Sequence, residues 1–352
     1  MNATDNATED SPVGTPAGTT TESTTETATE RTDDVTHSKR IRTTLVAGVG
    51  ALGMLALSAC AADTGSKSAS DEITLTVPSW VGARANAEVA KVIMEQELDV
   101  KVELQQLDEP VAFDALNNGK ADAILEDWGG SPKKEKLYVE DKKTIVKGGD
   151  LGVVGHIGWF VPKYYADANP EVTDAKNLNK FVKDFKSANS GEQGEFLGAA
   201  PSYTTYDEHL VKNLKLDLKI KETGNEAAQI KEIQQKYRDK QPFITYWWDP
   251  QWLNADIDLV EVKLPAYEEG CNVPETATDC AYANTPLQKY LNADFAKDGG
   301  DAAEFIKNFK WTTEAQNEVA KAIAKDKMSG PDAAEKWVKA NKSTWEAWLP
   351  KK

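Results

Sequence analysis

Residues 73–125 read ITLTVPSWVGARANAEVAKVIMEQELDVKVELQQLDEPVAFDALNNGKADAIL, and this stretch decides the fold class. Alternating or apolar runs of strand length occur at 73–77, 100–104 and 121–125. Apolar residues at helical spacing over 85–98, and a shorter helical segment over 113–118, separate these runs. The order strand, helix, strand, helix, strand indicates an α/β fold built on a parallel sheet.

Further strand patterns follow along the chain at 153–161, 243–247 and 257–262. Helical patterns occur near 176–186, 205–213, 226–239, 285–296, 301–307, 314–325 and 332–348. This order predicts two α/β lobes, the first formed by 72–153 plus 251–352 and the second by 154–250. The chain then crosses between the lobes twice, which makes a hinge beside a cleft where the carboxyl ends of strands bind ligands.

The N-terminal part of the chain has two compositions. Residues 1–36 are poor in large apolar side chains, which predicts a disordered extension. Residues 37–59 combine a basic patch with a short apolar run and end before Cys60, which is typical of a signal peptide and too short for a membrane span of about 20 residues. Because a signal peptide normally begins the chain, we expect translation to start near Val35. Residues 60–71 read as a flexible linker.

Leu57-Ser-Ala-Cys60 resembles the bacterial lipobox. The resemblance implies cleavage before Cys60, lipidation of its thiol, and anchoring to the outside of the cell membrane. Cys271 and Cys280 then remain as a pair. Since disulfides persist in exported proteins, we expect them to be bonded and to contribute about 2–3 kcal/mol, with two free thiols as the alternative.

Charge and motifs exclude several function classes. The net charge of −16 argues against nucleic acid as a partner, because such partners favour a basic face. No Cys/His cluster has zinc spacing, and no Gly-x-Ser-x-Gly motif is present. We therefore expect no metal, no cofactor and no catalytic residues.

Seven of the ten tryptophans fall into two groups. Core packing is the favoured interpretation for those near the C-terminus, which are Trp311, Trp337, Trp345 and Trp348. In contrast, Trp80, Trp128 and Trp248 each come directly after or at the end of a strand, where a cleft would open. A quaternary ammonium has no N–H to donate, so a site for it must use ring faces. At about 2 kcal/mol for each desolvated contact, three or four rings supply much of the roughly 8 kcal/mol of a micromolar complex.

Several motifs together carry a family resemblance. They are Ala85-Asn-Ala-Glu88, Gln106-Leu-Asp-Glu109, Asn118-Gly-Lys-Ala-Asp122 with Glu126-Asp-Trp128, Gly158-Trp-Phe-Val-Pro-Lys-Tyr164, residues 246–252 and residues 308–317. In this combination the chain resembles the substrate-binding proteins of glycine betaine/choline-type ABC importers over about 73–349. The resemblance implies a two-lobe periplasmic-binding-protein-like fold of type II, with a cleft that closes about a hinge.

The resemblance also implies an aromatic cage for the ligand. Trp128 and Trp248 match the cage positions best, and Trp80 matches a cage tryptophan of the choline-binding branch. Tyr203 stands where relatives often have a tryptophan. Trp159 is a further candidate, with a core role as the equal alternative.

For the end of the ligand opposite the ammonium group, these patterns leave several candidate contacts. Gln251 stands where relatives often have a histidine that helps to hold the ligand carboxylate. Backbone N–H groups of 79–82, Val81 among them, are the alternative holders of a carboxylate. Asp127 or Asp249 near the cage would instead favour a cation such as choline.

These patterns predict an extracytoplasmic solute-binding lipoprotein that delivers glycine betaine or a related quaternary ammonium compound to an ABC transporter permease. A receptor for choline, carnitine or another compatible solute is the alternative. A secreted carbohydrate-active protein would also be rich in tryptophan, but it needs a paired acid and base across its cleft, which the motifs do not provide.

Overall fold

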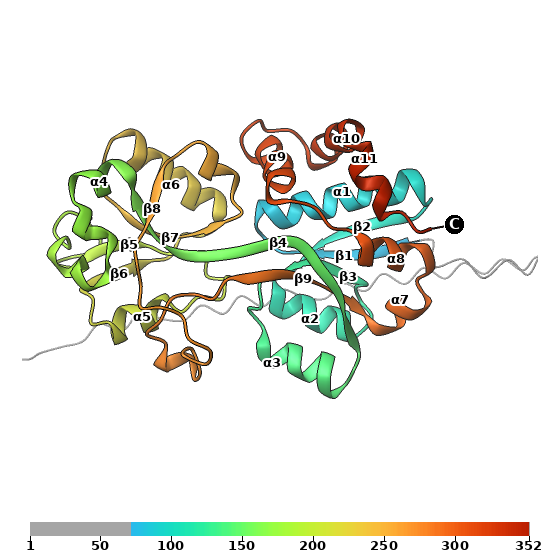
Figure 1. Ribbon diagram of the computed structural model, residues 1–352, viewed down its shortest axis with the longest axis horizontal. Coiled ribbons are helices and arrows are strands. Elements are labelled where there is room, and N and C mark those ends of the chain that lie inside the picture. Colours follow the sequence, from blue (N-terminus) through green and yellow to red (C-terminus); the bar gives the residue numbers. More distant parts are fainter. Residues whose placement is uncertain (1–71, 352) are drawn as a thin grey trace, which may run out of the picture. The chain divides into compact units, whose positions relative to one another are not determined.

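The computed structural model describes residues 72–351. The expectations for residues 1–71, namely the disordered extension, the signal peptide, the lipid-bearing Cys60 and the linker, lie outside the described residues. In the described part, the expected α/β fold with two lobes is confirmed. Its strands follow one another in the order β2-β1-β3-β9-β4-β7-β5-β6, with β8 attached beside β4 (Figure 1).

The lobe that we call lobe I is built on the first half of this order. β1 (Glu72–Val77) lies between β2 (Lys101–Gln106) and β3 (Ala123–Asp127) and is parallel to both. β9 (Thr285–Asn292) runs antiparallel to β3 and to the first part of β4 (Ile145–Pro162). The carboxyl ends of β1 and β3 therefore open at one edge of the sheet, and the loops that leave them meet there.

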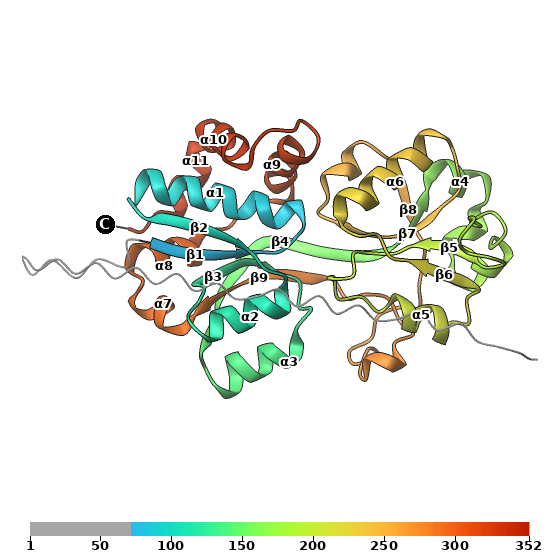
Figure 2. The ribbon, with the colours of Figure 1, turned by 180° about the vertical axis from the view of Figure 1, so that it is seen from behind.

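Helices cover both faces of the lobe I sheet. α1 (Val81–Glu97) packs against α9 (Thr313–Ala324) and α10 (Gly330–Ala340) on one face, while α2 (Glu109–Asn117) lies on the other (Figure 2). Residues 85–90 of α1 are all buried, because the helix packs against the sheet and also against α9 and α10. The remaining helical segments of this lobe are α3 (Pro132–Glu135), η1 (Lys136–Asp141), α7 (Ala293–Asp298), α8 (Gly300–Asn308), α11 (Lys342–Trp345) and η6 (Glu346–Trp348).

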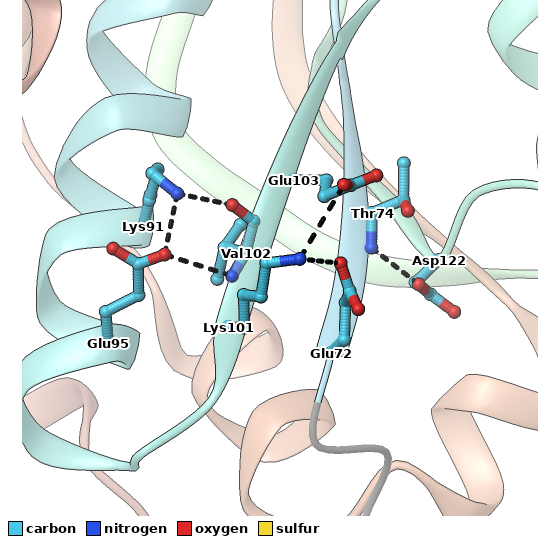
Figure 3. A network of polar contacts seen from close by, with 8 residues as sticks. All are labelled: Glu72, Thr74, Lys91, Glu95, Lys101, Val102, Glu103 and Asp122. Atoms are coloured by element: carbon cyan, nitrogen blue, oxygen red, sulfur yellow. Dashed lines mark hydrogen bonds and ion pairs between the residues drawn. The ribbon is translucent and has the colours of Figure 1, made fainter.

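Polar contacts tie α1 to the edge of the sheet and one strand to the next (Figure 3). Lys91 of α1 donates to Glu95 at 2.6 Å and also to the carbonyl of Val102 in β2. Glu95 in turn accepts the Val102 N–H at 3.2 Å. In β1, the N–H of Thr74 donates to the Asp122 carboxylate at 2.7 Å. These bonds satisfy backbone groups that the strand ladders leave free.

The lobe that we call lobe II is built on the second half of the order. β7 (Ile244–Asp249) and β8 (Leu259–Glu261) pair antiparallel with the second part of β4, and β5 (Gly194–Leu197) lies parallel to β6 (Leu218–Lys221) and β7. Its helical segments are α4 (Lys163–Ala168), η2 (Pro170–Thr173), η3 (Ala175–Lys180), α5 (Asp207–Asn213), α6 (Glu226–Arg238), η4 (Trp252–Ala255) and η5 (Glu275–Ala277).

β4 is common to the sheets of both lobes (Figure 1). It pairs with β9 as far as Gly155 and with β7 from His156 onwards, so the first crossing lies close to the expected one. The second crossing is later than expected. Return to lobe I at residue 251 is wrong, because β8 bonds to Phe160–Pro162 of β4 and the chain rejoins the lobe I sheet only at β9.

The C-terminal tryptophans belong to the core, as predicted. Trp311, Trp337, Trp345 and Trp348 are all buried. The rings of Trp337 and Trp348 stack with centroids 6.0 Å apart, and Trp311 meets Trp337 edge to face at 5.3 Å. These contacts fasten the last helices onto lobe I.

Candidate functional site

A cavity of about 240 Å³ lies between the two lobes and is lined mainly by aromatic rings. The rings are those of Trp80, Trp128, Tyr203, Tyr206, Tyr246, Trp248 and Tyr282. Trp80 and Trp128 come from lobe I, in the loops after β1 and β3, whereas Trp248 belongs to β7 of lobe II. Four sequence-predicted residues, Trp80, Trp128, Trp248 and Tyr203, are thus brought together.

Most of the rings form one continuous wall. Tyr203 meets Trp80 edge to face at 5.5 Å and Trp248 at 5.9 Å, which joins lobe I to lobe II. Tyr246 continues the wall, with its centroid 5.9 Å from that of Trp248 and 6.1 Å from that of Tyr282. Because neighbouring rings stand at steep angles, they enclose a space instead of filling it as a stack would.

Glu126, at the end of β3, holds the two lobe I tryptophans in place. Its Oε1 accepts the indole N–H of Trp80 at 2.6 Å and that of Trp128 at 2.8 Å. Its Oε2 accepts the side-chain amides of Asn86 and, at 2.6 Å, Gln316. The carboxyl group is only 1% exposed, and burial raises its pKa although the four donors oppose the rise. Sequence reasoning quoted Glu126 only as part of a motif and missed this role.

Glu109 is a second functional candidate that sequence reasoning missed. It is the only charged side chain on the cavity lining in the described part of the chain. Its Oε1 accepts the backbone N–H of Trp128 at 2.5 Å, and the residue is 6% exposed. Burial first, and then the nearby Asp127 carboxyl, raise the pKa of Glu109 well above its ordinary value. The sequence signal that could have identified Glu109 is its place at the end of the Gln106-Leu-Asp-Glu109 motif, at the start of α2.

Asp127 lies behind the cage and does not line the cavity. It is 2% exposed, and its Oδ2 accepts the N–H of Gly129 at 2.9 Å. Its Oδ1 has no partner, and burial raises the pKa of this carboxyl to about 7. Gly155 on β4 faces the ring of Trp128 so closely that any side chain there would overlap the ring. Asp249, the other acidic candidate, is exposed at the end of β7.

Val81 and Gln251 are not on the lining of the aromatic cavity, and their expected ligand contacts stay predictions. Both bond to Glu226, the first residue of α6. The N–H of Val81 donates to Glu226 Oε2 at 2.8 Å, and the Gln251 amide donates to Oε1 at 2.7 Å. A carboxylate of the protein thereby occupies the amino end of α1, where the helix dipole favours an anion. Burial raises the pKa of Glu226 to about 7.

Trp159 is also outside the cavity, and its core role is the correct alternative. It is 0% exposed and packs on Phe196 with centroids 4.8 Å apart. Its indole N–H donates to Asp207 at 2.7 Å. The same carboxylate accepts the hydroxyl of Tyr282 at 2.8 Å, and burial raises the pKa of Asp207 to about 6. Trp159 therefore supports the aromatic wall from behind through Asp207.

A loop closed by the Cys271–Cys280 disulfide borders the cavity. Asn272, beside the first cysteine, lines the cavity, as does Tyr282 just beyond the second. The amide of Asn272 donates to the hydroxyl of Tyr206 at 3.4 Å. The loop and the residue just beyond it thus contribute Asn272 and Tyr282 to the cavity lining.

The arrangement suits binding. Among residues 72–351, no group of three or more His, Cys, Asp or Glu side chains is placed to hold a metal ion. No helix in that range combines the length and apolar character needed to cross a membrane. What the cavity offers is a set of ring faces next to buried carboxyl groups, which together attract a cation.

Comparisons with known proteins agree with this geometry. Residues 71–340 match the family model of the substrate binding domain of ABC-type glycine betaine transport system. The chain is 27% identical, over 78% of its length and 89% of the relative, to the trimethylamine N-oxide-binding protein of Pelagibacter ubique.

Solved structures show the same fold. Lactococcal OpuAC, closed around glycine betaine, has a TM-score of 0.63 at 19% identity, covering 79% of this chain and 99% of that one. An ABC-transporter choline binding protein in complex with choline has a TM-score of 0.63 at 18% identity, covering 79% and 91%. Such relatives are binding proteins and not enzymes, so the carbohydrate-active alternative is set aside. Since the family match spans most of the described residues, the chain belongs to the substrate-binding domains of ABC-type glycine betaine transport systems.

Proposed function

We propose that this chain captures a small quaternary ammonium compound in its aromatic cavity and delivers it to the permease of an ABC transporter. The observation that carries the proposal is the wall of rings at Trp80, Tyr203 and Trp248, with Trp128 beside it on the same lining. A trimethylammonium head has no hydrogen-bond donor, so it is held by ring faces and dispersion.

The energy of such a site is sufficient. Each desolvated cation–π contact contributes about 2 kcal/mol, and four rings give about 8 kcal/mol before the costs of association. A micromolar complex has a net binding free energy of about 8 kcal/mol. Contacts at the other end of the solute then offset the association costs.

Closure around the solute is the second part of the proposal. Trp80 and Tyr203 come from different lobes, and so do the two partners in the hydrogen bond from Val81 to Glu226. A solute that contacts both lobes stabilises the closed arrangement, and the closed arrangement is what a permease would recognise.

The test is calorimetry with glycine betaine, choline, carnitine and trimethylamine N-oxide. Ectoine, which lacks a trimethylammonium group, serves as the control solute. We expect at least one of the four compounds to bind with a Kd of about 1 µM to 100 µM, and ectoine to bind much more weakly. Absence of binding by all four at millimolar concentration would remove the proposal.

The site of action is part of the same proposal. We place the protein outside the cytoplasm, anchored to the membrane through a lipid on Cys60, on the strength of the Leu57-Ser-Ala-Cys60 motif. The Cys60→Ala variant should leave the membrane fraction and appear in the soluble extracytoplasmic fraction. Retention of this variant in the membrane fraction would contradict lipid anchoring at this residue.

A further inference from the structure

We propose that Glu109 sets the charge preference of the cavity, so that the site favours a cationic trimethylammonium compound with an uncharged far end, such as choline, over one with a carboxylate, such as glycine betaine. This inference rests on the proposed function. It concerns the one charged group on the cavity lining in the described part of the chain.

The buried charges around the cage are all of one sign. Glu109, Glu126 and Asp127 are each less than 7% exposed. The four side chains that donate to Glu126 are neutral indoles and amides. No lysine, arginine or histidine lines the cavity within the described residues. A cation in the cage therefore supplies the opposite charge that these carboxyl groups lack.

Four N–H donors near the cavity are already bonded to carboxylates of the protein. The N–H of Trp128 donates to Glu109, and the N–H of Gly129 donates to Asp127. On the other side, the N–H of Val81 and the amide of Gln251 both donate to Glu226. The protein's own carboxylates thus occupy the anion-binding positions near the cage. A carboxylate on the solute would face the Glu109 carboxyl group and would depend on hydroxyl and amide donors of the lining, whereas an uncharged alcohol meets no like charge there.

If Glu109 sets the charge preference, solute binding should release or take up a proton at its carboxyl group, and the affinity should depend on pH. The titratable groups that act on it are Asp127 and Glu126 from β3, while Tyr246 from β7 and Tyr290 from β9 feel its charge in turn. Burial and Asp127 raise its pKa, so the proton is held more tightly in the empty cavity than in water. A bound cation stabilises the ionised form and releases a proton, so the affinity for choline should rise with pH. A bound carboxylate stabilises the protonated form, so the affinity for glycine betaine should fall with pH.

Calorimetry on the whole protein tests the inference with choline and glycine betaine as probes. Titrations in two buffers of different ionisation enthalpy, at about pH 5.5 and about pH 8, count the protons exchanged. At the higher pH we expect choline to bind at least about 10-fold more tightly than glycine betaine. Glu109→Gln should weaken choline binding by about 30-fold and reduce the ratio of the two affinities by at least about 10-fold.

The matched control is Glu318→Gln, which removes the same charge from an exposed position on α9. It should leave both affinities unchanged. An unchanged affinity ratio in the Glu109→Gln variant, or tighter binding of glycine betaine by the native protein at the higher pH, overturns the inference and leaves the proposed function standing.

Should the Glu109→Gln variant fail to fold, the proton count on the native protein decides the matter. Proton release with choline supports the role of Glu109, and uptake or no exchange refutes it. Failure of the native protein to bind any trimethylammonium compound would instead refute the proposed function itself.

Discussion

Replacing Glu126 separates two roles that a buried carboxylate under the cage could have, namely a hydrogen-bond acceptor and a negative charge. The Glu126 carboxylate accepts hydrogen bonds from four side chains, two on each oxygen. The side-chain oxygens of Asn86 and Gln316 have no partner. In Glu126→Gln, the remaining oxygen can still accept both indoles, and Asn86 and Gln316 can turn their amides so that their oxygens accept the new N–H groups.

The expected changes in stability and in affinity follow from the number of hydrogen bonds that each Glu126 variant keeps. For Glu126→Gln we expect the free energy of unfolding to change by less than about 1 kcal/mol and the Kd by less than about 3-fold. In Glu126→Leu all four buried donors lose their acceptor, at about 1–3 kcal/mol each, so the free energy of unfolding should fall by at least about 4 kcal/mol. If both indole rings then turn away, two contacts of about 2 kcal/mol are lost, which weakens binding by up to about 1,000-fold.

Urea denaturation measures the stability, and calorimetry with choline measures the affinity. Glu318→Gln again serves as the surface control. Equal loss of affinity in Glu126→Gln and Glu126→Leu would show that charge, and not ring positioning, is what Glu126 supplies. Unchanged affinity in Glu126→Leu would refute both roles.

Three other predictions concern separate parts of the molecule. Trp248→Ala should raise the Kd of the bound solute by about 30-fold, the equivalent of one cation–π contact, as measured by calorimetry; no change would remove Trp248 from the cage. The folded protein binds a proton on Glu226 more tightly than the unfolded chain does, because burial raises the pKa of this residue to about 7. The resulting stabilisation is complete below about pH 4.5 and is lost as the pH rises through 7, so the free energy of unfolding should fall by about 3 kcal/mol over that window. The fall should be smaller in Glu226→Gln, and an identical pH profile in the variant contradicts this prediction. Replacing Cys271 and Cys280 together with serine should cost about 2–3 kcal/mol of stability by denaturation and weaken binding, because Asn272 and Tyr282 beside them line the cavity; unchanged affinity would separate the loop from the site.

The positions of the tryptophans on the cavity lining could be predicted because they depend on local pattern. Trp80 and Trp128 follow strands that the alternation of residues identifies, and parallel strands bring their carboxyl ends to one edge. A different local signal, helical spacing, predicted the buried tryptophans near the C-terminus. Trp159 lies within a strand, where the pattern gives the face of the sheet but not the neighbour on that face. Its partner Asp207 comes from α5 in another part of the chain.

The polar network beneath the cage could not be predicted, because it joins residues far apart in sequence. Gln316 lies in the first turn of α9, where Thr312 is the cap, and its amide donates to Glu126, 190 residues away. Gln251 likewise bonds to Glu226, 25 residues away. No spacing rule encodes such contacts, since they depend on how whole helices pack onto the sheet. The return point of the chain to lobe I was misplaced for the same reason.

The shared strand β4 has a consequence for how the protein folds. β4 pairs with β9 in lobe I and with β7 in lobe II, so the sheet of each lobe is incomplete without this strand. A lobe expressed without β4 would expose the unpaired edge of the strand that β4 normally covers. A destabilising substitution in β4 should therefore lower the stability of both lobes. We therefore expect the two lobes to unfold together, in one cooperative transition, because both depend on the same backbone segment.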